Sequence, residues 1–229
     1  MAYIINGIPI KYIIYATIIL LAIVFIINYI RGPKLSKKYY SDKDIENGPI
    51  KLLKKYDEKL LNNIKSVINN KYYEWSENTL NTGSIKILPI YFFGIKNNTL
   101  QNLPYLSSFI NNINDIYSFI FMELAPKTHI DKNNGWGLYS NDIIRYVFCM
   151  KIYNTTIEIE GNVKELKTGE WIIYDTTKYH EIHNPGDTSS ILMIIDIKRP
   201  SNIERGSNKS PDMLEVINLF SIMRDINLQ

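Results

Sequence analysis

Residues 170–197 read EWIIYDTTKYHEIHNPGDTSSILMIIDI, a segment that alternates between apolar runs and polar turn residues. Two apolar runs, at residues 170–174 and 190–197, flank a polar segment that contains the sequence Asn-Pro-Gly-Asp at 184–187. Short apolar runs bounded by Gly, Pro, Asn and Asp are typical of β-strands joined by turns. The stretch therefore predicts two strands separated by a turn.

The same texture extends toward the amino end as far as residue 116. Further β-type runs lie at 116–124, 143–153 and 156–160, and turn sequences separate them. Many short strands with turns between them indicate a sandwich or barrel. Helical spacings of apolar residues flank this region at 50–70, 103–114 and 211–227, and residues 85–95 predict one or two strands. We therefore expect a mainly β domain with flanking helices over residues 49–229.

Composition excludes several classes of protein. With 45% hydrophobic and 21% charged residues, the 229-residue chain is not disordered throughout. A net charge of +3 gives no concentrated basic surface for nucleic acid. One cysteine, Cys149, excludes an intramolecular disulfide and a multi-cysteine zinc site. A histidine-based metal site must draw on His129, His180 and His183, the three histidines of the chain.

The amino end predicts a membrane anchor. Residues 13–30 are almost continuously apolar and approach the ~20 residues that cross a bilayer as a helix. A cleaved signal peptide and a buried core helix are the alternatives, but no small-residue cleavage site follows the segment. We expect an anchor over residues 1–31 and a polar linker over residues 32–48.

The basic residues around this segment predict its orientation. Lys11 precedes it, whereas Arg31, Lys34, Lys37 and Lys38 follow it, which favours a single-pass protein with a cytosolic domain. Three glycosylation sequons, starting at Asn97, Asn154 and Asn208, would suit the opposite side of the membrane.

His129 and Asp131 form a His-x-Asp pair at the end of the first β run. On an extended strand, residues two apart point to the same face. A second imidazole, from His180 or His183, would complete the two-histidine, one-carboxylate triad of non-haem Fe(II) oxygenases. His180 and His183 point to opposite faces of a strand, so only one of them can join the pair.

Four segments resemble the aspartyl/asparaginyl β-hydroxylases. They are ELAPKTHID at 123–131, LKTGEWIIYD at 166–175, HEIHNPGD at 180–187 and IIDIKRP at 194–200. The resemblance implies a double-stranded β-helix (jelly-roll or cupin-like) core that uses Fe(II) and 2-oxoglutarate. It assigns His129, Asp131 and His180 as the metal ligands, because the segment 180–187 is similar to the family's second metal motif.

Three positions depart from the family pattern. When the segment around 123–135 is aligned without gaps, Asn133 rather than His129 falls at the family's first metal histidine. Val147 falls at the histidine of the Arg-x-His strand. Ser190 replaces the arginine that pairs with the far carboxylate of 2-oxoglutarate. We expect Arg145 to serve as the cation for 2-oxoglutarate, with a hydroxyl contact from Ser190, because a buried dicarboxylate needs a cationic partner.

Three functions are consistent with these residues. The first is a membrane-anchored Fe(II)/2-oxoglutarate-dependent dioxygenase that hydroxylates an Asp or Asn side chain of a protein, or an acyl chain of a lipid, near the membrane. The second is a catalytically inactive jelly-roll binding or scaffold protein that has lost its 2-oxoglutarate anchor. The third is a cupin-like metalloenzyme that does not use 2-oxoglutarate.

Overall fold

The computed structural model describes residues 4–5, 8–31, 34–45, 48–51, 62–66, 72–75, 80–211 and 213–227. The chain divides into two compact units, one of residues 1–36 with 201–204 and the other of residues 37–200 with 205–229. Most of the helix predicted over residues 50–70 lies outside the described residues, although 49–51 and 62–66 are helical.

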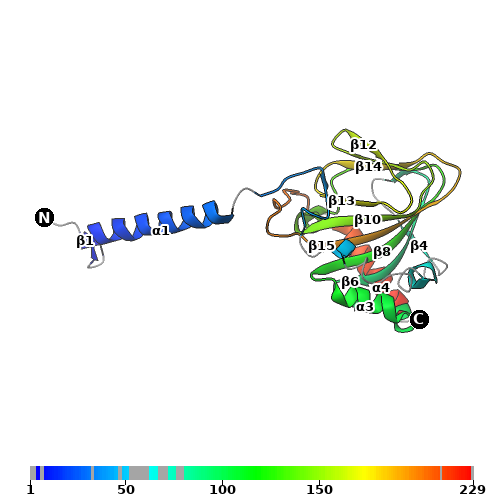
Figure 1. Cartoon of the computed structure of the whole chain (residues 1–229), viewed down its shortest axis with the longest axis horizontal. Helices are drawn as coiled ribbons and strands as arrows, with labels where there is room; N and C mark the ends of the chain where they lie inside the picture. Colours follow the sequence, from blue (N-terminus) through cyan, green and yellow to red (C-terminus); the bar gives the residue numbers. More distant parts are fainter. Residues whose placement is uncertain are drawn as a thin grey trace. The chain divides into compact units, whose positions relative to one another are not determined.

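The first unit contains one long helix. Strands β1 (Ile4–Ile5) and β2 (Ile8–Pro9) pair and lead into α1 (Ile10–Arg31), which confirms a helix where residues 13–30 predicted one (Figure 1). In the part of the chain that the structure describes, no helix combines the length and apolar character of a membrane span. The predicted transmembrane anchor is therefore not confirmed.

The second unit is built from two antiparallel sheets. The larger one, called the main sheet here, has the strand order β3-β13-β10-β15-β8-β6-β4, with β7 paired to β6 (Figure 1). Its strands are β3 (Tyr39–Tyr40), β4 (Tyr73–Trp75), β6 (Ile85–Phe92), β7 (Ile95–Lys96), β8 (Ile116–Leu124), β10 (Ile143–Lys151), β13 (Trp171–Tyr174) and β15 (Ser190–Lys198).

The smaller sheet, called the minor sheet here, has the order β12-β11-β14-β9-β5. Its strands are β5 (Leu80–Thr82), β9 (Thr128–Asn133), β11 (Thr156–Ile159), β12 (Asn162–Glu165) and β14 (His180–Asn184). Apolar side chains from both sheets form one core, including Met122 and Ile194 of the main sheet and Ile130 and Ile157 of the minor sheet. Two sheets that share a core in this way form the jelly-roll that the sequence predicts.

Two helices pack against the main sheet (Figure 1), and the second of them lies on the face that shares the core with the minor sheet. In α3 (Pro104–Asn112), Phe109 is buried with its ring 6.4 Å from that of Phe119 on β8. In α4 (Leu214–Asn227), Phe220 packs edge-to-face on Phe92 of β6 at 4.6 Å. The unit also contains the short 3-10 segments η1 (Asn98–Asn102) and η2 (Gly137–Asp142).

The predicted linker at residues 32–48 contains a strand of the main sheet. Tyr39 and Tyr40 of β3 pair with Tyr174 and Ile173 of β13, and Tyr40 is buried. The polar composition of this segment predicted a linker, but its two tyrosines form the edge strand of the main sheet.

Candidate functional site

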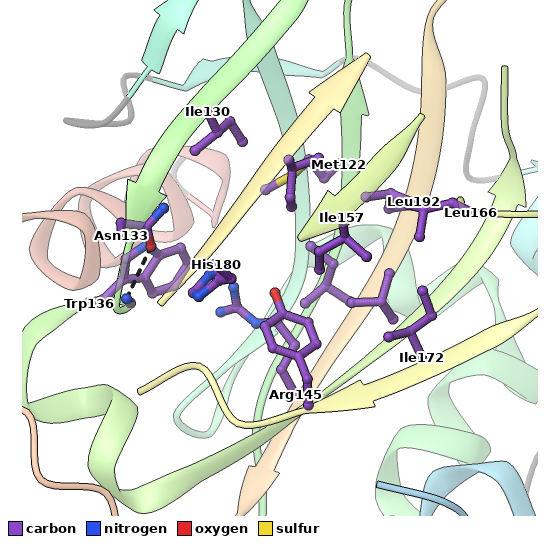
Figure 2. Close-up of a pocket in the computed structure, with 15 residues that line it drawn as sticks. Met122, Ile130, Asn133, Trp136, Arg145, Ile157, Leu166, Ile172, His180 and Leu192 are labelled. Atoms are coloured by element: carbon purple, nitrogen blue, oxygen red, sulfur yellow. Dashed lines mark hydrogen bonds between the residues drawn. The ribbon is translucent and has the colours of Figure 1, made fainter. Parts of the chain in front are cut away.

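A pocket lies between the two sheets of the second unit, where a jelly-roll binds its ligands (Figure 2). Most of its lining is apolar, and the polar side chains among the lining residues are Asn133, Trp136, Arg145, Tyr174 and His180. The apolar side chains come from both sheets: Met122, Ile130, Val147, Ile157, Leu166, Ile172, Ile182, Leu192 and Ile194. The free space between them is about 40 Å³, which holds roughly two or three water molecules.

Arg145 forms a buried ion pair on the main-sheet side of the pocket. Arg145 of β10 lies directly opposite Asp196 of β15 in the strand register. Its Nε donates to Oδ1 of Asp196 at 2.8 Å, and its Nη2 donates to Oδ2 at 2.9 Å. The hydroxyls of Ser118 and Tyr139 also donate to Oδ2, each at 3.0 Å. The carboxylate is fully buried and its charge is matched by one guanidinium.

The environment of Arg145 fixes its charge. Burial alone would lower the pKa of its guanidinium, but the Asp196 carboxylate more than reverses this and raises the pKa above its ordinary value. The guanidinium carbon also lies 4.9 Å from the ring centre of Trp136, a cation–π arrangement. Arg145 is therefore held charged, oriented and already neutralised by a carboxylate of the protein.

His180 enters the pocket from the minor sheet (Figure 2). Its Nδ1 lies 2.8 Å from the carbonyl oxygen of Lys178. Because a carbonyl oxygen only accepts, Nδ1 carries the proton and Nε2 carries the lone pair. Burial lowers the pKa of His180 from 6.5 to about 4, and the charge of Arg145 adds to this effect. The imidazole is therefore neutral at physiological pH.

Asn133 is the residue that the fold places opposite His180. The two are register partners across β9 and β14, and both line the pocket. The Asn133 side chain is engaged in a turn: its Oδ1 accepts from the Gly135 amide at 3.0 Å, and its Nδ2 donates to the Asp131 carbonyl at 3.0 Å. The structure therefore brings Asn133, the residue that the gapless alignment places at the family's first metal histidine, opposite His180.

His129 and Asp131 do not join His180, which corrects the predicted triad. They do share a face, with Nδ1 of His129 3.6 Å from Oδ1 of Asp131. Ile130, between them, is buried and lines the pocket, so strand alternation sends both of its neighbours to the outer face of the minor sheet. There the ring of His129 lies 4.9 Å from that of His183. We call His129 and His183 the outer histidine pair.

The two residues predicted to contact 2-oxoglutarate, Arg145 and Ser190, do not line the same pocket. Arg145 lines the pocket, but Ser190 is not among the lining residues. The Ser190 hydroxyl is buried, lies 2.7 Å from the hydroxyl of Thr155 and accepts from the amide of Tyr153 at 3.0 Å. Val147, at the family's histidine position, does line the pocket and adds an apolar surface.

Sequence reasoning did not identify Asp196 as the partner of Arg145, although this carboxylate already neutralises the guanidinium. A signal was present, because Asp196 is an isolated charge in the apolar run 190–197, just as Arg145 is in 143–150. Single opposite charges within two buried strands are expected to pair, since an unpaired buried charge is very costly.

The sequence profile of the aspartyl/asparaginyl β-hydroxylases matches residues 51–200, about two thirds of the chain. This chain belongs to the aspartyl/asparaginyl β-hydroxylase family. The family consists of hydroxylase-type dioxygenases, and membership implies in general a dependence on Fe(II) and 2-oxoglutarate. No curated protein sequence matches the chain significantly.

Several solved structures have a similar backbone. A predicted oxalate decarboxylase from Thermotoga maritima is 13% identical, with a TM-score of 0.39 over 58% of this chain and 96% of that one. The cupin-2 domain of an XRE family transcriptional regulator from Enterobacter cloacae is 12% identical, with a TM-score of 0.36 over 51% and 98%. The cupin domain of Cnp3 from Schizosaccharomyces pombe is 8% identical, with a TM-score of 0.38 over 58% and 72%.

The residues of this hydroxylase-family pocket do not fit an Fe(II) centre. A facial triad needs two imidazoles and a carboxylate, whereas the pocket offers the imidazole of His180 and the amide of Asn133. The nearby carboxylate of Asp196 is occupied by Arg145 and two hydroxyls. Among the described residues, no group of three or more His, Cys, Asp or Glu side chains is arranged to hold a metal.

Proposed function

We propose that this chain is a non-catalytic binding member of the hydroxylase family, which keeps the jelly-roll and has lost the oxygenase centre. The observation that carries the proposal is the position of Asn133, opposite His180, where the family pattern has a metal histidine. An amide is a weaker ligand for Fe(II) than an imidazole. The outward orientation of His129 and Asp131 leaves the pocket without a replacement for the lost histidine.

The charge balance of the pocket supports the same proposal. A dicarboxylate such as 2-oxoglutarate requires an unpaired cation when it is buried. Arg145 is the guanidinium in the lining, and two of its nitrogen atoms already bind Asp196. Displacing Asp196 would leave a buried carboxylate without its counter-charge, at a cost of several kcal/mol.

The size of the pocket is a third, independent support. Ligand pockets of drug-sized molecules measure roughly 300–1,000 Å³, whereas about 40 Å³ is free here. Val147 and Ser190, at two positions that hold 2-oxoglutarate in the family, bring neither charge nor an imidazole into this space. We therefore expect the domain to bind its partner, a protein or lipid beside the membrane, through its outer surface.

The family match favours a second candidate, an Fe(II)/2-oxoglutarate-dependent hydroxylase acting on an Asp or Asn side chain or on an acyl chain. Its support in the pocket is His180, whose Nε2 lone pair is available. The jelly-roll would supply a water-poor cavity for such chemistry. The two candidates differ in one property, which is whether the pocket chelates a metal together with a keto acid.

Anaerobic titration of the full-length protein with Fe(II) and then 2-oxoglutarate separates them. A chelated keto acid gives a visible metal-to-ligand charge-transfer band, and we expect no such band from the wild-type pocket. The variant His129→Gln with His183→Gln serves as the background that removes the outer imidazoles. A band that persists in this background and disappears in His180→Gln would establish the hydroxylase and overturn the binding proposal.

The same background permits a gain-of-function test. Asn133→His restores an imidazole opposite His180, and we expect this variant to bind Fe(II) more tightly than its parent. Asn133→Gln is the matched control, because it retains the amide and provides no imidazole. Equal Fe(II) binding by both variants would mean that position 133 is not the lost ligand position.

We also propose, from the sequence, that residues 13–30 hold the domain at a membrane with the domain in the cytosol. The support is the apolar composition of this segment and the basic residues that follow it. Extraction of cell membranes with alkaline carbonate tests the proposal. Retention of the full chain in the pellet is expected, and complete release into the supernatant would contradict it.

A further inference from the structure

The outer histidine pair forms a two-imidazole cluster outside the pocket. His129 of β9 and His183 of β14 are direct register partners on adjacent antiparallel strands. Their ring centres lie 4.9 Å apart with the planes inclined by 42°. We propose that this pair is a binding site for a divalent transition-metal ion of the Ni²⁺, Cu²⁺ and Zn²⁺ group.

The spacing of the two rings suits a shared ion. Imidazole nitrogens coordinate such metals at ~2.0–2.1 Å, so two neighbouring ligand nitrogens lie about 3 Å apart. Ring centres 4.9 Å apart bring ring nitrogens into this range after small side-chain rotations. Both residues have room to rotate, because His183 is exposed and the His129 side chain is 30% exposed.

The strand positions, in contrast, are rigid. Each histidine lies within a strand that is paired on both sides, β9 between β5 and β14, and β14 between β9 and β11. The backbone therefore holds the two Cα atoms at a fixed separation, and only side-chain freedom is lost when an ion binds. This preorganisation lowers the cost of binding compared with two histidines on loops.

A carboxylate lies beside the pair, and two more lie on the same face of the minor sheet. Asp131 lies 3.6 Å from Nδ1 of His129 and accepts a hydrogen bond from Nδ2 of Asn81 at 3.1 Å. A carboxylate beside one nitrogen of a ligating histidine orients the ring and strengthens its other nitrogen as a ligand. Glu181 and Glu158 are register partners on the same face, which strand alternation assigns because Glu181 is two residues from His183.

The imidazole nitrogens determine which class of ion the site can bind. Imidazole suits Zn²⁺, Cu²⁺ and Ni²⁺, whereas Mg²⁺ and Ca²⁺ prefer sites made of oxygen ligands alone. Among the described residues no cluster offers three or more such ligands, so water completes the coordination of the two imidazoles. Affinity is expected to follow the Irving–Williams order, with Cu²⁺ bound most tightly.

Calorimetric titration of the full-length protein with Ni²⁺ tests the site, since the three histidines provide matched variants. We expect one ion per chain, with binding lost or weakened more than about tenfold in His129→Gln and in His183→Gln. His180→Gln removes one imidazole from the pocket and is expected to bind Ni²⁺ as the wild type does. Asp131→Asn should weaken binding by about tenfold, in line with other carboxylates that orient a ligand.

Two outcomes would overturn the proposal. One is equal Ni²⁺ binding by the wild type and both outer variants. The other is loss of binding in His180→Gln alone, which would move the metal into the pocket and would also argue against the non-catalytic proposal. Thermal unfolding of each variant without metal shows whether a loss of binding reflects a loss of fold. The outer side chains are exposed, so we expect their variants to remain folded.

Discussion

The pocket and the outer face of the minor sheet lie on opposite sides of the same two strands, β9 and β14, and their chemistry differs completely. Inside, His180 is buried and neutral among apolar side chains, and the cation of Arg145 is cancelled by Asp196. Outside, His129 and His183 meet near the carboxylate of Asp131. The face on which a residue lies, and not its motif, therefore decides whether it can take part in a site.

The largest expected effect comes from breaking the ion pair inside the pocket. Replacing Arg145 by Met leaves the Asp196 carboxylate buried without its cation, and we expect the free energy of unfolding to fall by ~3–5 kcal/mol. Arg205→Met is the control, because Arg205 pairs with Asp142 on the surface at 3.0 Å and such pairs contribute ~0–1 kcal/mol. Urea unfolding measures both variants, and similar losses would contradict the structural role of Arg145.

The pH dependence of stability should report the buried histidine. Because the pKa of His180 is about 4 in the folded protein and 6.5 ordinarily, the unfolded chain takes up a proton first as the pH falls. The contribution of neutral His180 to the free energy of unfolding is therefore fully present above pH 6.5. It decreases by about 1.4 kcal/mol per pH unit, roughly 3 kcal/mol in all, down to pH 4. Urea unfolding across this range measures the loss.

His180→Gln provides the control for this pH dependence. The variant lacks the buried imidazole, so its stability should change less between pH 6.5 and pH 4 than that of the wild type. An identical pH profile in the two proteins would mean that His180 is not held neutral in the folded state.

A smaller effect distinguishes a buried residue of β9 from an exposed one. Ile130→Val removes a buried methylene from the pocket lining, and we expect a loss of ~0.5–1.5 kcal/mol. Lys132→Ala changes an exposed side chain of the same strand and should remain within about ±0.5 kcal/mol. Chemical denaturation measures both, and a larger loss at Lys132 than at Ile130 would contradict the burial of Ile130 in the pocket lining.

Apolar runs and turn residues predicted much of the fold. The run at 116–124 coincides with β8 (Ile116–Leu124), and 190–197 differs from β15 by one residue. Both strands are buried, so continuous apolarity identifies them. No apolar run marks the bounds of β9 and β14, because their polar outer residues, such as His129 and Glu181, interrupt the apolar pattern.

The candidate site could be predicted only in part, for a related reason. Alternation correctly placed His129 and Asp131 on one face and His180 and His183 on opposite faces, but it does not say which face is inside. The side chain that settles this is Ile130, since the apolar position of a half-buried strand faces the core. The pairing of Arg145 with Asp196 depends on the register of β10 and β15, which no local pattern contains.

The three histidines divide between the two faces of the minor sheet, with the pair proposed to bind metal on the outer face. Long-range ¹H–¹⁵N NMR spectra resolve the individual imidazoles, and a substoichiometric amount of paramagnetic Cu²⁺ broadens those that coordinate it. We predict that the signals of His129 and His183 broaden first and most strongly and that the signal of His180 is less affected. Selective broadening of His180, with His129 and His183 unaffected, would contradict the account.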